Sequence, residues 1–262
     1  MAKVVFSLFL IISGIIHPES AFYTPTRGLF ISEIGKFNQK DGKIIHVKSL
    51  RNPKTNVILS GLKDPKGITI YKNKLWIADV YRLVSLNLDT SRVSIIEGSS
   101  FSPQPSFLND VCQVGNAILV SDTRKNIVYR VEKNRATKMF LVTAPNGIAY
   151  SSTLRTTYIA TFTKPGRIFS IRGNTANELY ASTLINGTDG ITLWKQEEIL
   201  FVSGFVAGNV LAISLRNRRI LGSIQGLFNP ADIYFNDRRM LLFVPEMGKN
   251  RVLIYKVRTK GN

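Results

Sequence analysis

The chain has 262 residues, of which 44% are hydrophobic and 20% are charged, and this length fits one large all-β domain or two smaller domains. Its single cysteine, Cys112, excludes an internal disulfide framework and a thiolate metal cluster. Lys and Arg number 35 against 17 Asp and Glu, a formal net charge of +18, so the surface is either an ordinary solvated basic surface or one that binds a polyanion. No specific nucleic-acid motif accompanies this charge.

Residues 1–17 form an apolar N-terminal segment, in which the run 4–16 follows the single cation Lys3. The run is short for a membrane span, which needs about 20 residues, but it suits the core of a signal peptide. It is also rich in β-branched and aromatic residues, which favour a strand. Two alternatives stay open: a signal peptide that exports the protein to the periplasm or the cell exterior, or a retained strand or anchor in a cytoplasmic or membrane-anchored protein.

From residue 18 onward one pattern recurs along the chain. Each copy starts with a short polar segment, continues with an apolar strand such as 29–35 and an alternating strand such as 42–48, and in five copies adds a fourth strand such as 56–61. The polar segments are PES at 18–20, PKG at 65–67, LND at 108–110, PNG at 145–147, TDG at 188–190 and PAD at 230–232. Period-two patterning bounded by Gly, Asn, Asp and Pro indicates strands and hairpins, and no helical period is sustained.

Four strands repeated about every 42 residues are typical of a propeller blade. We therefore expect residues 18–262 to form an all-β, six-bladed β-propeller with four-stranded antiparallel blades; the alternative is a pair of β-sandwiches with even spacing. The sixth copy ends after its third strand, so part of residues 3–14 is expected to complete the last blade. Without it, that blade would keep an open edge that favours aggregation.

The first strand of each propeller blade begins at the central channel, so the six polar segments should converge on one opening. The residues expected there are Glu19, Lys66, Asn109, Asn146, Asp189 and Asp232. Carboxylate and amide oxygens suit Ca²⁺, Mg²⁺ or Mn²⁺, whereas two histidines and one cysteine make zinc a poor candidate. The alternative is structural, because Asn and Asp before Gly are common turn formers. The acids at the ends of second strands, Asp79, Asp122 and Glu246, are interpreted as structural.

The segments PES at 18–20, FLND at 107–110 with VSDT at 120–123, PNGIAY at 145–150 and DGITL at 189–193 together resemble one family. It is that of senescence marker protein (regucalcin), gluconolactonase and luciferin-regenerating enzyme. The resemblance spans about residues 18–257 and looks closest to the exported bacterial branch, through 28–44, 64–70 and 230–235. It implies a divalent metal in the channel, bound by Glu19, Asn146 and Asp189. It also implies that Asn109 contacts substrate and that Asp189 is the general base of a lactone hydrolase.

Two positions depart from that family's pattern. Phe107 stands where the lactonases carry an arginine that helps to hold the sugar, and Lys66 places a cation in the channel that could contact substrate or repel the metal. The expectation is therefore a monomeric, divalent-metal-dependent hydrolase of a lactone-like small molecule. The alternative is a non-catalytic propeller that binds a ligand, a partner or a polyanion through a basic face.

Overall fold

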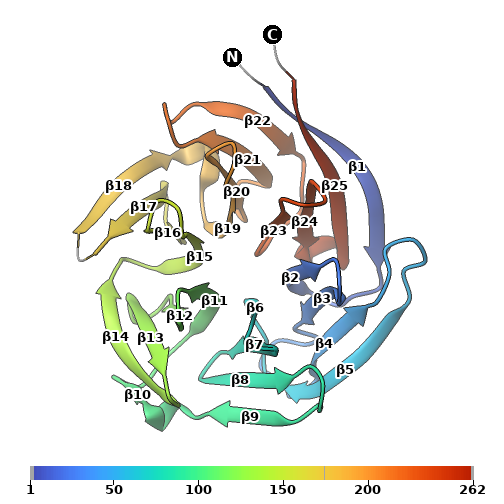
Figure 1. Cartoon of the computed structure of the whole chain (residues 1–262), viewed down its shortest axis with the longest axis vertical. Helices are drawn as coiled ribbons and strands as arrows, with labels where there is room; N and C mark the ends of the chain where they lie inside the picture. Colours follow the sequence, from blue (N-terminus) through green and yellow to red (C-terminus); the bar gives the residue numbers. More distant parts are fainter. Residues whose placement is uncertain (1–2, 174, 261–262) are drawn as a thin grey trace.

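The computed structural model describes residues 3–173 and 175–260 and is a six-bladed β-propeller of antiparallel, mostly four-stranded sheets (Figure 1). This confirms the predicted fold class. Within the described residues, helical structure is limited to the 3-10 turns η1 (Gly98–Ser100), η2 (Thr183–Ile185) and η3 (Met247–Lys249). None of the described helices is both long enough and apolar enough to cross a membrane.

The strands of the six blades, given from the central channel outward, are the following. Blade 1 contains β2 (Pro18–Thr24), β3 (Gly28–Glu33), β4 (Gly42–Val47) and β5 (Thr55–Leu62). Blade 2 contains β6 (Ile68–Tyr71), β7 (Lys74–Asp79), β8 (Arg82–Asn87) and β9 (Val93–Ile96). Blade 3 contains β11 (Leu108–Val114), β12 (Ala117–Asp122), β13 (Ile127–Glu132), β14 (Arg135–Leu141) and a short parallel strand, β10 (Phe101–Ser102). Blade 4 contains β15 (Pro145–Ser151), β16 (Thr156–Thr161), β17 (Gly166–Arg172) and β18 (Thr175–Ser182). Blade 5 contains β19 (Thr188–Trp194), β20 (Ile199–Gly204), β21 (Asn209–Ser214) and β22 (Ile220–Gln225). Blade 6 contains β23 (Tyr234–Asn236), β24 (Leu241–Glu246), β25 (Arg251–Lys260) and, outermost, β1 (Lys3–Ser13).

The second strands read as continuous apolar runs because each blade packs between two others. Every residue of β3, β12, β16, β20 and β24 is buried, since both faces of the strand lie against neighbouring blades. The outer strands instead keep much of their surface in solvent, as in β18. The hydrophobic core is therefore a set of layers between the blades that surrounds the channel.

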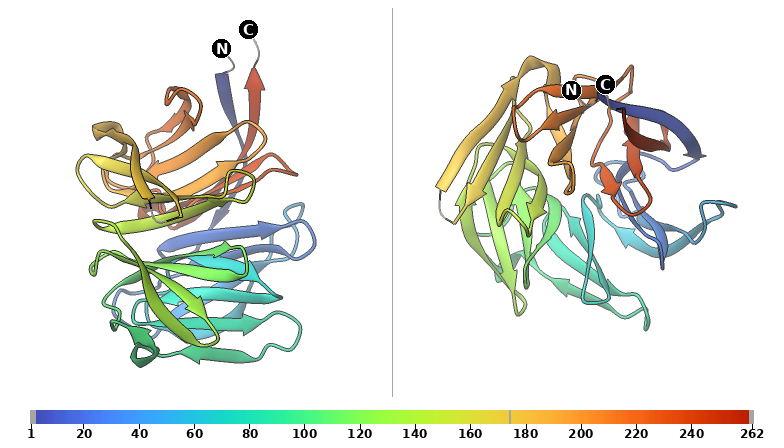
Figure 2. Two further views of the ribbon diagram at one scale, coloured as in Figure 1. Left: turned by 60° about the vertical axis from the view of Figure 1, so that its left-hand side comes forward. Right: turned by 45° about the horizontal axis from the view of Figure 1, so that its top comes forward.

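The first and last strands of the chain close the ring together. β1 pairs antiparallel with β25 from Lys3↔Lys260 to Ser13↔Arg251, with a bulge between Leu8 and Leu10, and the two described ends lie side by side (Figures 1 and 2). The strand is therefore part of the packed structure rather than an appendage. Whether processing removes residues 1–17 stays a prediction.

Candidate functional site in the central channel

The predicted polar segments lie where the inner strands begin, and most of them form β-bulges. The pairing of β2, β11, β15 and β19 with the next strand shifts at 18–20, 108–111, 145–148 and 188–191. A bulge interrupts the two-residue alternation and turns side chains that a regular strand would direct elsewhere. The recurring pairs of residues in the sequence are thus the positions where the chain departs from regular pleating.

The second and third residues of each polar segment form a pair. The first residue of each pair is buried at the mouth of the channel. These residues are Glu19, Lys66, Asn109, Asn146, Asp189 and Ala231, each at most 8% exposed. Lys66 Nζ lies 3.8 Å from Glu19 Oε1, the Asn146 side chain hydrogen-bonds Asp189, and Glu19 and Asp189 repel each other electrostatically. The structure therefore brings these four side chains together from four different blades.

The second residues of the pairs form a separate layer that joins neighbouring blades. They are Ser20, Gly67, Asp110, Gly147, Gly190 and Asp232. Asp232 Oδ2 accepts a hydrogen bond from Ser20 Oγ at 2.5 Å, and Asp110 Oδ2 accepts one from the Ile148 amide at 2.6 Å. The expected place of Asp232 beside Glu19 and Asp189 in one ring was thus wrong by one position, because Ala231 is the equivalent residue.

The glycines of this second layer are required by close packing between blades. A Cβ atom on Gly147 would lie 2.4 Å from the Asp189 carbonyl oxygen, and one on Gly190 would lie 2.4 Å from the Ile233 nitrogen. Neither glycine is among the residues with positive φ. The turn chemistry considered from the sequence is therefore not the reason for these glycines; the approach of the next inner strand is.

Serines on the second strands satisfy the backbone amides that the bulges leave unpaired. The hydroxyls of Ser32, Ser121 and Ser203 accept hydrogen bonds from the amides of Ser20, Asp110 and Gly190, respectively, at 2.8–2.9 Å. Sequence analysis missed these residues. Their signal is a serine at the same place in alternate second strands, within ISE at 31–33, VSD at 120–122 and VSG at 202–204.

Four buried carboxyl groups share this region with the ammonium group of Lys66. Burial holds the pKa of Glu19 and of Asp232 well above the usual range and raises the pKa of Asp189 to about 7 and that of Asp110 to about 6. Lys66 lowers the pKa of Glu19 and of Asp189 but does not cancel the effect of burial. The region can therefore hold protons near neutral pH or take up a further cation.

Two unpaired oxygens at the mouth fit a bound cation. Glu19 Oε2 and Asp189 Oδ1 are buried without a hydrogen-bond partner, although buried polar atoms are normally paired. No group of three or more His, Cys, Asp or Glu side chains placed to hold a metal occurs in the described part of the chain. A cation here would therefore depend on two carboxylates together with the amide oxygen of Asn146, and Lys66 would compete with it.

The remaining predicted residues surround this mouth. Asn109 donates a hydrogen bond from Nδ2 to Thr123 Oγ1 at 3.2 Å. Two cations lie near the ring of Phe107, with Lys66 Nζ at 5.5 Å and the guanidinium carbon of Arg124 at 4.6 Å from its centroid. Arg124 was not anticipated from the sequence, and it places a positive charge beside Phe107.

The acids at the ends of second strands are structural, as interpreted from the sequence. Asp79 Oδ1 accepts hydrogen bonds from the Lys63 and Asp64 amides. Asp122 and Glu246 bind the amides of the loops that enter blades 3 and 6. Each carboxylate therefore fixes the loop that leads into the inner strand of its own blade.

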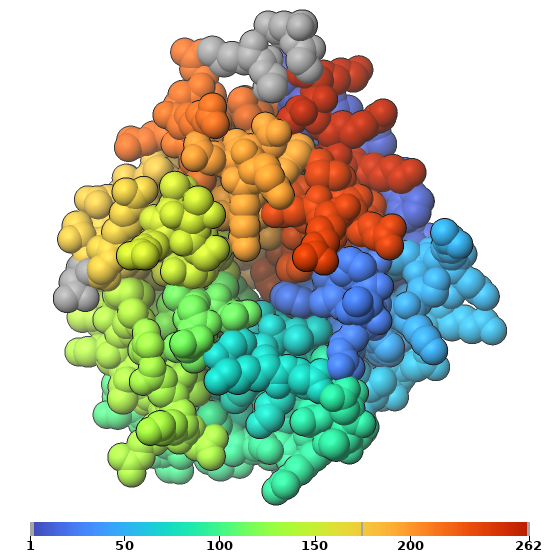
Figure 3. Space-filling model, in the orientation of Figure 1, coloured from blue at the N-terminus to red at the C-terminus, as the bar shows by residue number. Residues whose placement is uncertain are grey.

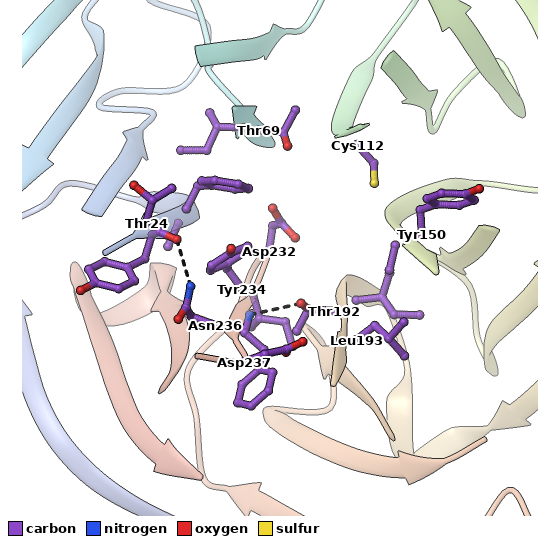
Figure 4. A pocket seen from close by; sticks show the side chains of 18 of the residues that line it. Thr24, Thr69, Cys112, Tyr150, Thr192, Leu193, Asp232, Tyr234, Asn236 and Asp237 are labelled. Carbon is purple, nitrogen blue, oxygen red and sulfur yellow. Dashed lines mark hydrogen bonds between the residues drawn. The ribbon is translucent and has the colours of Figure 1, made fainter. Parts of the chain in front are cut away.

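Beyond the second layer the channel widens into a cavity of about 480 Å³ at its opposite end. The side chains of Thr69, Cys112, Tyr150 and Thr192 line it, and Asp232 lies at its inner end (Figure 4). Glu19, Asn146 and Asp189 are not among its lining residues. The space-filling view shows the blades arranged around a central hollow (Figure 3).

The comparisons support the fold. A scan against protein-family models found no match, and a search of curated proteins found none either. Among solved structures, a gluconolactonase from Xanthomonas campestris is 15% identical with a TM-score of 0.76, covering 98% of this chain and 90% of its own. A calcium-binding regucalcin from Agrobacterium tumefaciens is 16% identical with a TM-score of 0.74, covering 96% and 93%. A chain of a nidogen/laminin complex is 13% identical with a TM-score of 0.72, covering 82% and 86%. At these identities the likeness shows the six-bladed propeller, and two of these structures are of the family that the sequence resembles.

Proposed function

We propose that the protein is a hydrolase that acts on a lactone-like small molecule at the mouth formed by Glu19, Asn146 and Asp189. The observation that carries the proposal is the pair of buried, unpaired oxygens, Glu19 Oε2 and Asp189 Oδ1. They come from inner strands of different blades, and the Asn146 side chain lies beside Asp189. The similar gluconolactonase and regucalcin structures support the same assignment.

The three side chains would hold a divalent cation, either Ca²⁺, Mg²⁺ or Mn²⁺, through oxygen atoms. Such a cation supplies Lewis-acid polarisation of a carbonyl oxygen and lowers the pKa of bound water. The chain itself provides Asp189, a buried carboxylate that would act as the base exchanging a proton with the bound water or substrate. Arg124 and Lys66, which both lie near the Phe107 ring, are placed to contact an anionic or hydroxylated substituent of the ligand.

The test is lactone hydrolysis by the purified chain with added Ca²⁺, Mg²⁺ or Mn²⁺, followed by removal of the ion with a chelator. We expect turnover to require the ion, and we expect Asp189→Asn to lower kcat by roughly 100-fold or more, because a general base contributes about that much. Asp237→Asn is the matched control, because Asp237 lines the cavity at the other end of the channel. A chain that binds no divalent ion and hydrolyses no lactone would refute the proposal.

One observation favours a second candidate, a non-catalytic propeller that binds an anionic ligand. Lys66 Nζ already lies 3.8 Å from Glu19 Oε1, with its side chain 10% exposed, and so provides a resident positive charge where a metal would bind. Binding of heparin, used as a model polyanion, should then weaken steeply between about 50 and 200 mM salt. Salt-insensitive binding would count against this candidate.

Export from the cytoplasm is proposed on the signal-like run 4–16, and N-terminal sequencing of the mature protein tests it. A mature start beyond residue 15 would show cleavage, and it would also remove β1 from blade 6. A start at residue 1 or 2 would contradict cleavage and leave the closing strand in place.

A further inference from the structure

Exposed apolar side chains are distributed unequally between the two faces of the disc. We call the face where the inner strands begin the entry face; it comprises the loops before each inner strand and those between second and third strands. We call the opposite face the exit face. The entry-face loops and turns carry Ile16, Phe37, Tyr81, Phe162, Leu184, Val206 and Phe228, which are 38–64% exposed. The other exposed large apolar residues of the described chain lie on the outer strands β1, β5, β9, β14 and β22, and none lies in an exit-face loop.

Buried hydrogen bonds hold part of this apolar set in place. Glu33 Oε2 accepts a hydrogen bond from the Ile16 amide at 3.2 Å, and Glu246 Oε1 accepts one from the Phe228 amide at 2.8 Å. Both carboxylates are buried. The exposure of these side chains is therefore fixed by the fold. Loops that are already ordered lose little conformational freedom on binding, so these hydrogen bonds make the entry face a preorganised contact surface.

The entry face is also positively charged. Its exposed cations are Lys36, Lys40, Arg124, Lys125, Lys164 and Lys249. Glu97 is the one fully exposed acid in these loops, all of which lie in the described chain. Lys249 Nζ lies 4.1 Å from the centroid of the Phe228 ring, and Lys63 Nζ lies 4.7 Å from that of Tyr81. Cationic groups thus lie directly beside two of the exposed aromatic rings of this face.

We propose that the entry face docks onto an anionic lipid bilayer. The apolar side chains would enter the boundary between headgroups and acyl chains, while the lysines and Arg124 would contact the headgroup phosphates. Several of the apolar groups, including Ile16, Leu184 and Val206, have no ring on which a nucleic-acid base could stack. The set is spread around a disc rather than gathered in one patch, so it matches a flat surface. This inference does not depend on the hydrolase proposal.

The test is cosedimentation of the full chain with vesicles of phosphatidylcholine alone or with about 30% phosphatidylserine. We expect binding to the anionic vesicles. We expect the triple variant Phe162→Ser, Val206→Ser, Phe228→Ser to bind them more than about tenfold more weakly, because it loses apolar insertion but no charge.

The matched control is Val57→Ser, Ile95→Ser, Leu141→Ser, which removes exposed apolar side chains from the outer strands β5, β9 and β14. Circular dichroism establishes that both variants remain folded. Equal binding by the wild type and the entry-face variant would overturn the proposal, since net charge alone would then explain the association. Absence of wild-type binding to anionic vesicles would also overturn it, as would an equal loss in the control variant.

Discussion

The two ends of the central channel are built by the same six inner strands, but they differ in packing and in charge. At the entry end, bulged segments bring Glu19, Lys66, Asn146 and Asp189 close together. At the exit end the strands pair regularly, and they enclose a cavity of about 480 Å³ whose lining includes hydroxyl, aromatic and charged side chains, such as Thr192, Tyr150 and Asp237 (Figure 4). The irregular backbone at the entry end packs ionisable side chains against one another, whereas the regular backbone at the exit end leaves an open cavity.

The largest effect on stability is expected from Gly190→Ala at the entry end, which should lower the free energy of unfolding far more than a glycine substitution at the exit end. The new Cβ would lie 2.4 Å from the Ile233 nitrogen and 2.7 Å from the Asp232 Cα, both backbone atoms of the next blade. We expect a loss of roughly 3 kcal/mol or a failure to fold, because the backbone cannot give way easily. Urea unfolding followed by circular dichroism measures the change.

Gly115→Asn on the exit face is the matched control for that substitution. A Cβ there would meet nothing within 4 Å, and Asn tolerates the φ of +58° better than other residues do. Its cost should stay below about 1 kcal/mol. Equal losses in the two variants would show that the entry-end layer is not a tight contact between blades.

The sequence was enough to predict the architecture because the strand repeat is regular over most of the chain. It also located the mouth of the channel, since equivalent pairs such as Asn146-Gly147 and Asp189-Gly190 recur at the start of inner strands. It did not separate the two layers within each pair, because a bulge changes which side chain turns inward. Asp232 was assigned to the wrong layer because it is the third residue of PAD at 230–232, whereas the other five residues expected at the opening are the second residues of their segments.

Some contacts at the mouth could not be predicted from any single segment. Arg124 lies over Phe107 because two loops of blade 3 meet on the entry face, and no short motif records that meeting. Likewise, the 3.8 Å approach of Lys66 to Glu19 depends on how two blades are placed relative to each other. Long side chains from separate blades are the part of the site that sequence spacing constrains least.

A smaller effect is expected from Lys66→Met at the entry end. Removing the ammonium group beside Glu19 should strengthen Ca²⁺ binding by on the order of tenfold, because a competing positive charge is lost from a buried site. Isothermal titration calorimetry with Ca²⁺ alone at about pH 8 measures this without any substrate, at a pH where carboxylates are normally ionised.

Lys195→Met is the control, because it also removes one positive charge, but from an exposed residue that lines the exit cavity. It should leave the affinity unchanged. If Lys66→Met binds Ca²⁺ no better than the wild type, or binds it more weakly, then Lys66 does not compete with a cation at the mouth.

The smallest effect concerns the dependence of stability on pH, and it again separates the two faces. Burial raises the pKa of Asp110 to about 6, above the value of about 3.9 for an unfolded chain, so the folded state binds this proton more tightly. The stability from Asp110 is therefore fully present below about pH 4 and is lost as the pH rises through about 6. Glu19, Asp189 and Asp232 face the same region and shift in the same direction, while Lys66 lowers the pKa of Glu19 and of Asp189.

Asp110→Asn removes this carboxyl together with the charge by which it raises the pKa of Glu19, Asp189 and Asp232. The altered hydrogen bonds from the Val111 and Ile148 amides affect stability equally at every pH. Between pH 7 and 5 the wild type should gain about 1 kcal/mol more in its free energy of unfolding than this variant does. Asp89→Asn on the exit face should instead follow the wild type over that range. The pKa of Asp89 is lowered by its hydrogen bond to Arg27, so its stabilising effect is lost only at lower pH. Urea titrations at the two pH values decide the matter, and parallel curves for the wild type and Asp110→Asn would mean that the buried carboxyl of blade 3 does not take up a proton in this range.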